Sequence, residues 1–125
     1  MLQPQHRLKK MKDIEILMKQ GRFVGGKLLT VKIWKINPDK FPRRNYSKDD
    51  LLIGFSIGKK ISKSAVKRNF YKRKIREAVR LLLKEKEILP GAMVMFMAKS
   101  EIKEATYKEI ETEVSLLLKK IKIIK

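Results

Sequence analysis

The sequence contains no cysteine and only one histidine. Without cysteine the chain can form neither a disulfide nor a thiolate metal site, and it has no cysteine nucleophile, which fits a reducing, cytoplasmic setting. Long hydrophobic runs are also missing. No stretch approaches the roughly 18 apolar residues that a membrane span needs, and no apolar signal segment follows the N-terminus. We therefore expect a soluble, cytoplasmic protein that does not span a membrane.

Acidic residues are scarce, with 13 Asp and Glu against 32 Lys and Arg, which leaves a net charge of +19 on 125 residues. Charge of one sign repels itself in a compact fold, so an excess of this size indicates a polyanionic partner. Nucleic acid is the first candidate and an anionic membrane surface the second. A membrane-surface role would need a helix with a large exposed apolar face opposite its lysines, whereas both amphipathic helices have a sheet to pack against, so we expect no membrane partner. General lysine enrichment, as in a heat-adapted or AT-rich lineage, would predict balancing glutamates in ion-pair networks, and the composition lacks them.

With 43% apolar residues the chain has enough to build a core, and its length fits one domain over residues 1–125. The apolar spacing predicts helix, strand, strand, helix, strand and helix at residues 8–20, 28–36, 51–58, 64–85, 92–98 and 104–121. This αββαβα order indicates an α+β fold in which helices cover one small mixed β-sheet. Within the first strand, Leu29, Val31 and Ile33 would face the core.

Positive charge is concentrated between Lys59 and Arg80, where ten basic residues and one acid supply +9 of the +19. On the predicted helix, polar and basic residues recur at three- and four-residue steps opposite the apolar stripe: Asn69, Lys72, Arg73, Arg76 and Arg80. A solvated helix face would usually mix signs, so this stripe favours binding of a polyanion. The loop before the helix, residues 58–64, adds lysines and free backbone N–H groups that suit phosphate.

Two segments closely resemble the signature of the bacterial ribonuclease P protein subunit. Residues 54–61 read Gly-Phe-Ser-Ile-Gly-Lys-Lys-Ile, and residues 65–79 read Ala-Val-Lys-Arg-Asn-Phe-Tyr-Lys-Arg-Lys-Ile-Arg-Glu-Ala-Val. The family's pattern there is an Arg-Asn-Arg core followed by Lys-Arg and Arg-Glu on one long helix. The N-terminal Arg7-Leu-Lys-Lys, Gly21 and the strand that follows are also similar to that family.

The sequence departs from the family's pattern at three places. Phe70 stands where the family usually has Arg or Lys as the third member of its basic core. Ile14 and Met18 occupy positions where the family often has Phe on its first helix. The loop over residues 37–50 is also longer than usual.

The resemblance implies a protein component of an endoribonuclease, a hydrolase that acts in tRNA processing. In that family the RNA subunit carries out Mg²⁺-dependent hydrolysis at the 5′ end of the mature tRNA sequence. The protein binds ribonuclease P RNA through the signature helix and holds the single-stranded 5′ leader of precursor tRNA between its first helix and its sheet. The resemblance also implies a left-handed β-α-β crossover, against the right-handed rule that holds in roughly 98% of cases.

These expectations define two sets of site residues. The interface with the catalytic RNA would consist of Lys59, Lys60, Lys63, Lys67, Arg68, Asn69, Lys72, Arg73, Arg76 and Arg80. A single-stranded leader needs a basic groove with flat or apolar surfaces, and the cleft for it would consist of Ile14, Met18, Thr30, Lys32, Trp34, Gly54 and Ser56. The ring of Trp34 could stack on a base or serve as half-buried packing. Met93, Met95 and Met97 alternate along a strand and are expected to fill the core.

The chain itself shows no catalytic constellation. A two-histidine ribonuclease needs a general acid and a general base, and His6 is the only histidine, near an N-terminus expected to be frayed. The acidic residues are scattered, so we expect no catalytic residue, no metal site, no cofactor on the protein and no obligate protein partner. The alternative is a ribosomal or general RNA-chaperone protein, which would share the charge but would not explain the spacing of the basic residues.

Overall fold

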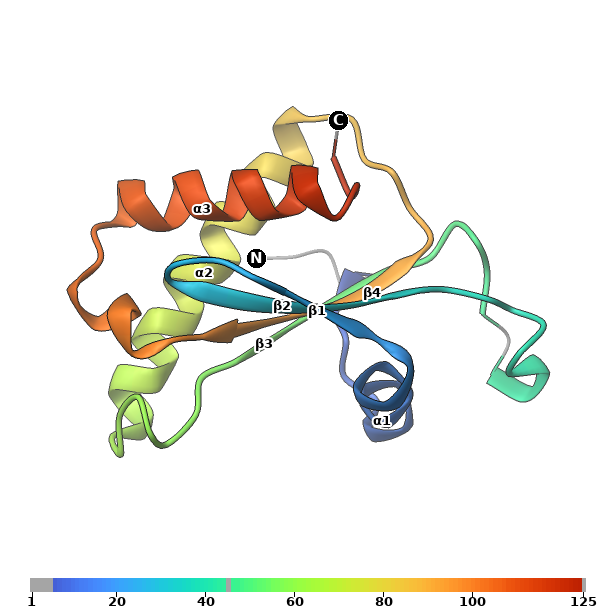
Figure 1. The fold of residues 1–125 in the computed structure, drawn as a ribbon, viewed down its shortest axis with the longest axis horizontal. Helices are drawn as coiled ribbons and strands as arrows, with labels where there is room; N and C mark the ends of the chain where they lie inside the picture. Colours follow the sequence, from blue (N-terminus) through green and yellow to red (C-terminus); the bar gives the residue numbers. More distant parts are fainter. Residues whose placement is uncertain (1–5, 45, 125) are drawn as a thin grey trace.

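The computed structural model describes residues 6–44 and 46–124 and has the α+β architecture that the sequence predicts, with all six predicted elements (Figure 1). Its helices and strands are α1 (Met11–Gln20), β1 (Arg22–Gly25), β2 (Leu29–Lys35), β3 (Leu51–Ser56), α2 (Ala65–Glu85), β4 (Ala92–Ala98) and α3 (Tyr107–Lys120). Two 3-10 turns, η2 (Pro42–Arg44) and η3 (Ser100–Glu104), lie in the connections. None of the helices in the described ranges is long and apolar enough to cross a membrane.

The four strands form one mixed sheet in the order β1-β2-β4-β3. Strand β2 runs antiparallel to β1 and β4, whereas β3 and β4 are parallel, with Ile53 opposite Val94. Because α2 connects these two adjacent parallel strands, β3, α2 and β4 form a β-α-β crossover unit. The left-handedness of this crossover stays a prediction from the family resemblance.

The start of the first helix and the strand after it differ from the prediction. The first helix begins at Met11 and not at Leu8, because the N–H group of Leu8 donates to the carbonyl of Ile53 at 3.0 Å and Arg7 forms a parallel bridge with Ile53. The N-terminal segment thus lies along the outer edge of β3. Strand β1 was not predicted, since its four residues are too few for a clear alternation and only Val24 is buried.

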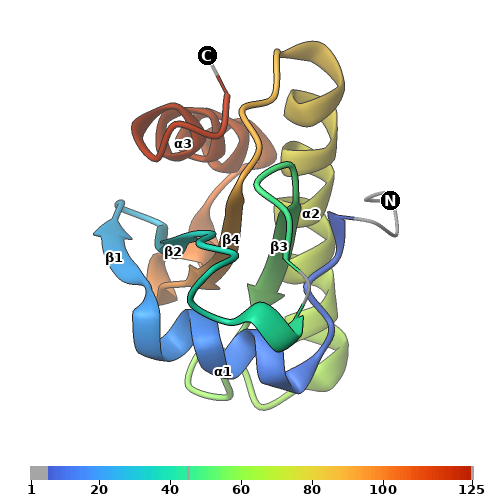
Figure 2. The same cartoon turned by 90° about the vertical axis from the view of Figure 1, so that its right-hand side faces the viewer.

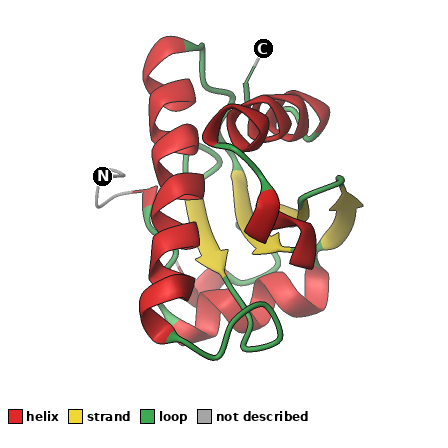
Figure 3. Ribbon diagram, turned by 90° about the vertical axis from the view of Figure 1, so that its left-hand side faces the viewer, coloured by secondary structure: helices red, strands yellow, loops and turns green. Residues whose placement is uncertain are grey.

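The main core lies on the sheet face that α2 and α3 cover (Figure 3). As predicted, the side chains of Leu29, Val31 and Ile33 point into it from β2. Helix α2 contributes its predicted apolar stripe and α3 packs alongside, so that the charged sides of both helices remain in contact with solvent.

A second, smaller core fills the space between the opposite sheet face and α1, which crosses the strands in Figure 2. Ile16 and Leu17 of α1 pack there with Trp34 of β2. Met93 and Met95 are buried in this cluster and Met97 packs against it, which confirms the prediction that these methionines fill the core. The sheet is therefore covered on both faces along much of its length.

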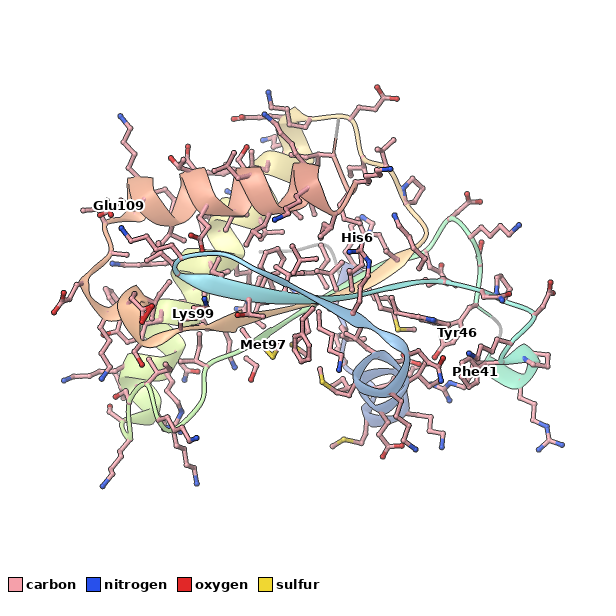
Figure 4. The ribbon with its side chains drawn as sticks, viewed as in Figure 1. His6, Phe41, Tyr46, Met97, Lys99 and Glu109 are labelled. Carbon is pink, nitrogen blue, oxygen red and sulfur yellow. The ribbon has the colours of Figure 1, made fainter. Side chains whose placement is uncertain are left out.

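The connection between β2 and β3 is fastened to α1 by a buried carboxylate. Asp13 is only 6% exposed, and its Oδ1 accepts hydrogen bonds of 2.6 Å from the guanidinium of Arg44 and from the hydroxyl of Tyr46. Phe41 and Tyr46 lie next to each other beside α1 in Figure 4, and both make edge-to-face contacts with Trp34. Burial, followed by the hydrogen bond with Asp13, raises the pKa of Tyr46. The long loop thus closes one end of the second core.

Helix α3 is tied to the turn between β1 and β2 by Glu113. Its carboxylate accepts hydrogen bonds from the backbone N–H groups of Lys27, Leu28 and Leu29 at 2.9, 2.7 and 2.6 Å. A Cβ at Gly26 would lie 3.0 Å from this carboxylate, so the glycine lets the turn and the carboxylate come this close. One side chain therefore satisfies three consecutive donors more than 80 residues away.

Replacing Glu113 by Ala should lower the free energy of unfolding by about 1–3 kcal/mol, because partly buried N–H groups would lose their acceptor. Glu111→Ala on the exposed face of the same helix is the matched control, with an expected change within about 0.5 kcal/mol. Urea denaturation of both variants measures the difference. Equal stabilities would show that solvent replaces the carboxylate at no cost.

Candidate nucleic-acid interface

Helix α2 presents a basic surface because its apolar residues are used on the opposite side. Ser64 caps its first turn by accepting a hydrogen bond from the N–H of Lys67 at 3.3 Å. Ile75 and Val79 are fully buried on the side of α2 that faces the main core. The basic residues recur on the remaining surface, where neither core covers them.

The structure places all ten residues of the predicted RNA interface on α2 or on the loop that leads into it. Six of them are exposed to solvent: Lys59, Lys60, Lys63, Lys67, Asn69 and Arg73. The other four are partly covered: Arg68, Lys72, Arg76 and Arg80. This arrangement is consistent with one accessible basic surface. Contact of these side chains with RNA stays a prediction.

Two of the partly covered arginines already have partners within the protein. The Nη1 of Arg68 donates to the carbonyls of Ser62 and Lys63, both at 2.9 Å, and thereby holds the loop against the start of the helix. The guanidinium of Arg80 pairs with Glu77 in the same helix, and this hydrogen bond lowers the pKa of the carboxyl. Arg68 therefore shapes the surface, and the charge of Arg80 is offset locally by Glu77.

A basic pocket of about 270 Å³ lies between α2 and the N-terminal segment along the edge of β3. Lys72 and Arg76 line it from the helix, Arg7 and Lys9 line it from the segment, and the backbone around Gly54 forms its floor. Because phosphates are bound through cationic side chains and exposed backbone, this pocket extends the basic surface beyond α2. The sequence motif did not group Arg7 and Lys9 with the helix, since only the pairing of the N-terminal segment with β3 brings them together.

The proposed leader cleft is only partly open. Trp34 is 7% exposed and lies beneath α1 and the long loop, so the prediction that it lines an accessible cleft is wrong, and the ring packs within the second core. Lys32 is 8% exposed, and its Nζ donates to the carbonyl of Met18 at 2.5 Å. Gly54 is buried as well, because Leu8 and Met95 fill the space in front of it. Alternation along a strand distinguishes two faces but does not reveal that both are covered.

The remaining cleft residues lie at the border of this covered region. Ile14 is partly buried against the second core, Met18 is 36% exposed, Thr30 is partly buried and Ser56 is exposed. Thr30 and Ser56 are both aligned with Met97 of β4, one from each side, so they share one sheet face.

Phe23 is the functional candidate that sequence reasoning missed. It pairs with Lys32 across the β1–β2 ladder, so both side chains lie on the same sheet face. Phe23 is 63% exposed, and the Nζ of Lys32 lies 4.4 Å from the centre of its ring. Recognition of β1 as a strand would have placed this aromatic residue beside the cleft.

Side chains that commonly bind metal ions are not clustered within the described ranges. No group of three or more His, Asp or Glu is arranged there to hold a metal ion, so no step of a reaction is assigned to a metal on this protein. His6 is not frayed, since its Nδ1 lies 3.0 Å from the carbonyl of Leu51.

The mixed sheet and its basic helix define a small α+β protein with a surface suited to a polyanion. The family model described as Ribonuclease P matches residues 2–122. The chain is 34% identical over 123 residues to the ribonuclease P protein component of Alkaliphilus metalliredigens, covering 98% of this chain and 99% of that protein. It is 36% identical over 116 residues to the corresponding protein of Clostridioides difficile, covering 93% and 91%.

Solved structures agree with this fold. The ribonuclease P protein of Staphylococcus aureus superposes with a TM-score of 0.75 at 26% identity, over 96% of this chain and 98% of that one. The Thermotoga maritima protein has a TM-score of 0.71 at 19% identity, over 91% and 96%, and shows the fold alone. The chain belongs to the ribonuclease P protein family.

Trp34→Ala should lower the free energy of unfolding by about 3–5 kcal/mol, the usual cost of removing a large buried ring. Phe23→Ala, which removes an exposed ring from the same sheet face, is the control and should change stability by about 0.5 kcal/mol or less. Thermal or urea denaturation measures both. A Trp34 variant as stable as its parent would contradict the burial of this ring between α1 and the sheet.

Proposed function

We propose that this protein is the protein subunit of ribonuclease P, which binds the catalytic RNA and promotes endonucleolytic removal of the 5′ leader from precursor tRNA. The observation that carries the proposal is the basic surface of α2 and its preceding loop, in a chain of this family. The RNA subunit would supply the Mg²⁺-dependent hydrolysis. The protein would contribute binding and positioning of the RNA.

The basic surface is suited to the RNA backbone and not to base sequence. Lysine and arginine side chains spread over a helix, a loop and a pocket can each neutralise a phosphate and release a counterion. Such contacts fix the orientation of an RNA without reading it. The α2 surface therefore suits a partner that is recognised by its shape, such as a folded catalytic RNA.

The leader would follow the part of the sheet face that α1 leaves open. Phe23 and Met18 offer apolar surface there, and Thr30 and Ser56 offer hydroxyl groups at the same end of the sheet. A single strand held by stacking and backbone contacts is recognised by its presence more than by its sequence. In this proposal Lys32 and Trp34 act through the fold, since they hold α1 against the sheet and thereby shape the groove.

Lys72→Ala together with Arg76→Ala should weaken binding to a bacterial ribonuclease P RNA and make it less dependent on salt. Each lost phosphate contact should reduce the slope of log K against log salt by about 0.7–0.9. Lys119→Ala together with Lys120→Ala removes the same charge from α3 and should leave the slope nearly unchanged. Filter binding at several salt concentrations gives the slopes.

The same proteins should be assayed for precursor tRNA cleavage at low Mg²⁺ with ribonuclease P RNA. The parent protein should stimulate cleavage, and the α2 variant should need a higher concentration to do so. Binding without stimulation would favour the ribosomal or RNA-chaperone alternative over a subunit of the processing enzyme.

Phe23→Ala should reduce affinity for precursor tRNA with a leader of several nucleotides by about 1–3 kcal/mol, the usual contribution of one base stacked on an aromatic ring. Affinity for mature tRNA should be unchanged. Leu116→Ala removes an equally exposed apolar side chain from α3, on the other side of the sheet, and should affect neither RNA. Equal losses for both RNAs with Phe23→Ala would exclude this face as the leader site.

A further inference from the structure

An aromatic residue stands in the middle of the basic surface of α2. Phe70 is 51% exposed, in the helix position where the family resemblance leads us to expect a third basic residue. Exposure of a large apolar ring to water is unfavourable. A surface whose only task is to neutralise phosphates gains nothing from this ring.

The surroundings of Phe70 have the composition of a nucleotide site. The Nζ of Lys74 lies 4.3 Å from the centre of the ring, and Tyr71 contacts the ring at a steep angle. Phe70 and Lys74 line a pocket of about 500 Å³ together with Arg73, Arg76, Glu77 and Tyr107. This size lies within the range of pockets that hold small organic groups.

Tyr107, at the start of α3, contributes a second and independent feature. Its hydroxyl is the one buried side-chain polar atom in residues 6–44 and 46–124 that has no hydrogen-bond partner. Burial, with Glu111 and Glu77 nearby, raises the pKa of this phenol. A buried hydroxyl without a partner is unfavourable, and a ligand that supplies one removes the cost.

We propose that the pocket between Phe70 and Tyr107 binds one unpaired nucleobase of an RNA. The base would stack on the Phe70 ring, its polar edge would bond to the Tyr107 hydroxyl, and the adjacent phosphates would contact Arg73 and Lys74. Stacking is available to every base because each has a flat π-face, and cationic side chains around the ring add backbone contacts. This inference rests on the proposed function, because the RNA that supplies the base would be the ribonuclease P RNA.

The test measures the affinity and the salt slope of full-length variants with a bacterial ribonuclease P RNA. Phe70→Leu keeps an apolar side chain but removes the flat ring, and it should weaken binding about 5-fold or more without changing the slope, because the ring neutralises no phosphate. Arg73→Ala should instead reduce the slope by about 0.7–0.9. Val66→Ala, an exposed apolar residue one turn earlier in α2, is the matched control and should have no effect.

Tyr107→Phe separates a binding role from a structural one. The hydroxyl has no partner in the free protein, so its removal should leave the thermal midpoint unchanged or higher while binding weakens roughly 2- to 12-fold. A loss of stability with unchanged affinity would overturn its role in binding.

Photocrosslinking keeps the proposal testable if a variant folds poorly. Ribonuclease P RNA containing 4-thiouridine, irradiated in complex with the unaltered protein, should link to the α2 peptide that carries Phe70. If the RNA binds with a steep salt dependence but forms no such link, and Phe70→Leu binds normally, the base site is overturned and the proposed function stands. Failure of the unaltered protein to bind the RNA would overturn both.

Discussion

Burial of β4 on both faces is the constraint around which the molecule is organised. Met93, Val94 and Phe96 are fully buried, so the central strand needs an apolar layer on each side. Helices α2 and α3 provide one layer, while α1, Trp34 and the long loop provide the other. With both layers in place the interior holds nearly all the large apolar side chains, and the charge of +19 is left on the outside. The self-repulsion of that charge is opposed by a two-sided core and relieved when a polyanion binds.

The sequence predicted the elements that local periodicity controls. The apolar stripe of α2, the helix over residues 64–85 and the strand at residues 92–98 follow from apolar spacing, and the structure confirms them closely. Contacts between distant residues could not be predicted in this way. Asp13 meets Arg44 across 31 residues, and Glu113 meets the turn at Leu28 across 85. These contacts cover Trp34 and fasten α3, so the open groove is narrower than strand alternation alone suggested.

Aromatic residues mark the difference between the predicted surface and the observed one. Trp34, the candidate for base stacking from the sequence, lies in the second core, while Phe23 and Phe70 are exposed on opposite sides of the molecule's sheet layer. The sequence alone does not show whether an aromatic ring and a lysine lie side by side on the surface. That depends on the helix or strand, which sets the direction of both side chains. Once those directions are known, each exposed ring has a cation within 4.4 Å of its centre. Flat apolar surface and positive charge therefore occur together at two separate places.

The strand order has a consequence for synthesis of the chain. Strand β4 lies between β2 and β3 in the sheet but follows both of them in the sequence. On the ribosome, β2 and β3 emerge without their common neighbour, and the basic helix α2 also precedes it. The sheet can close only after residues 92–98 leave the exit tunnel, so most of the positive charge is exposed to cellular RNA before the fold is complete.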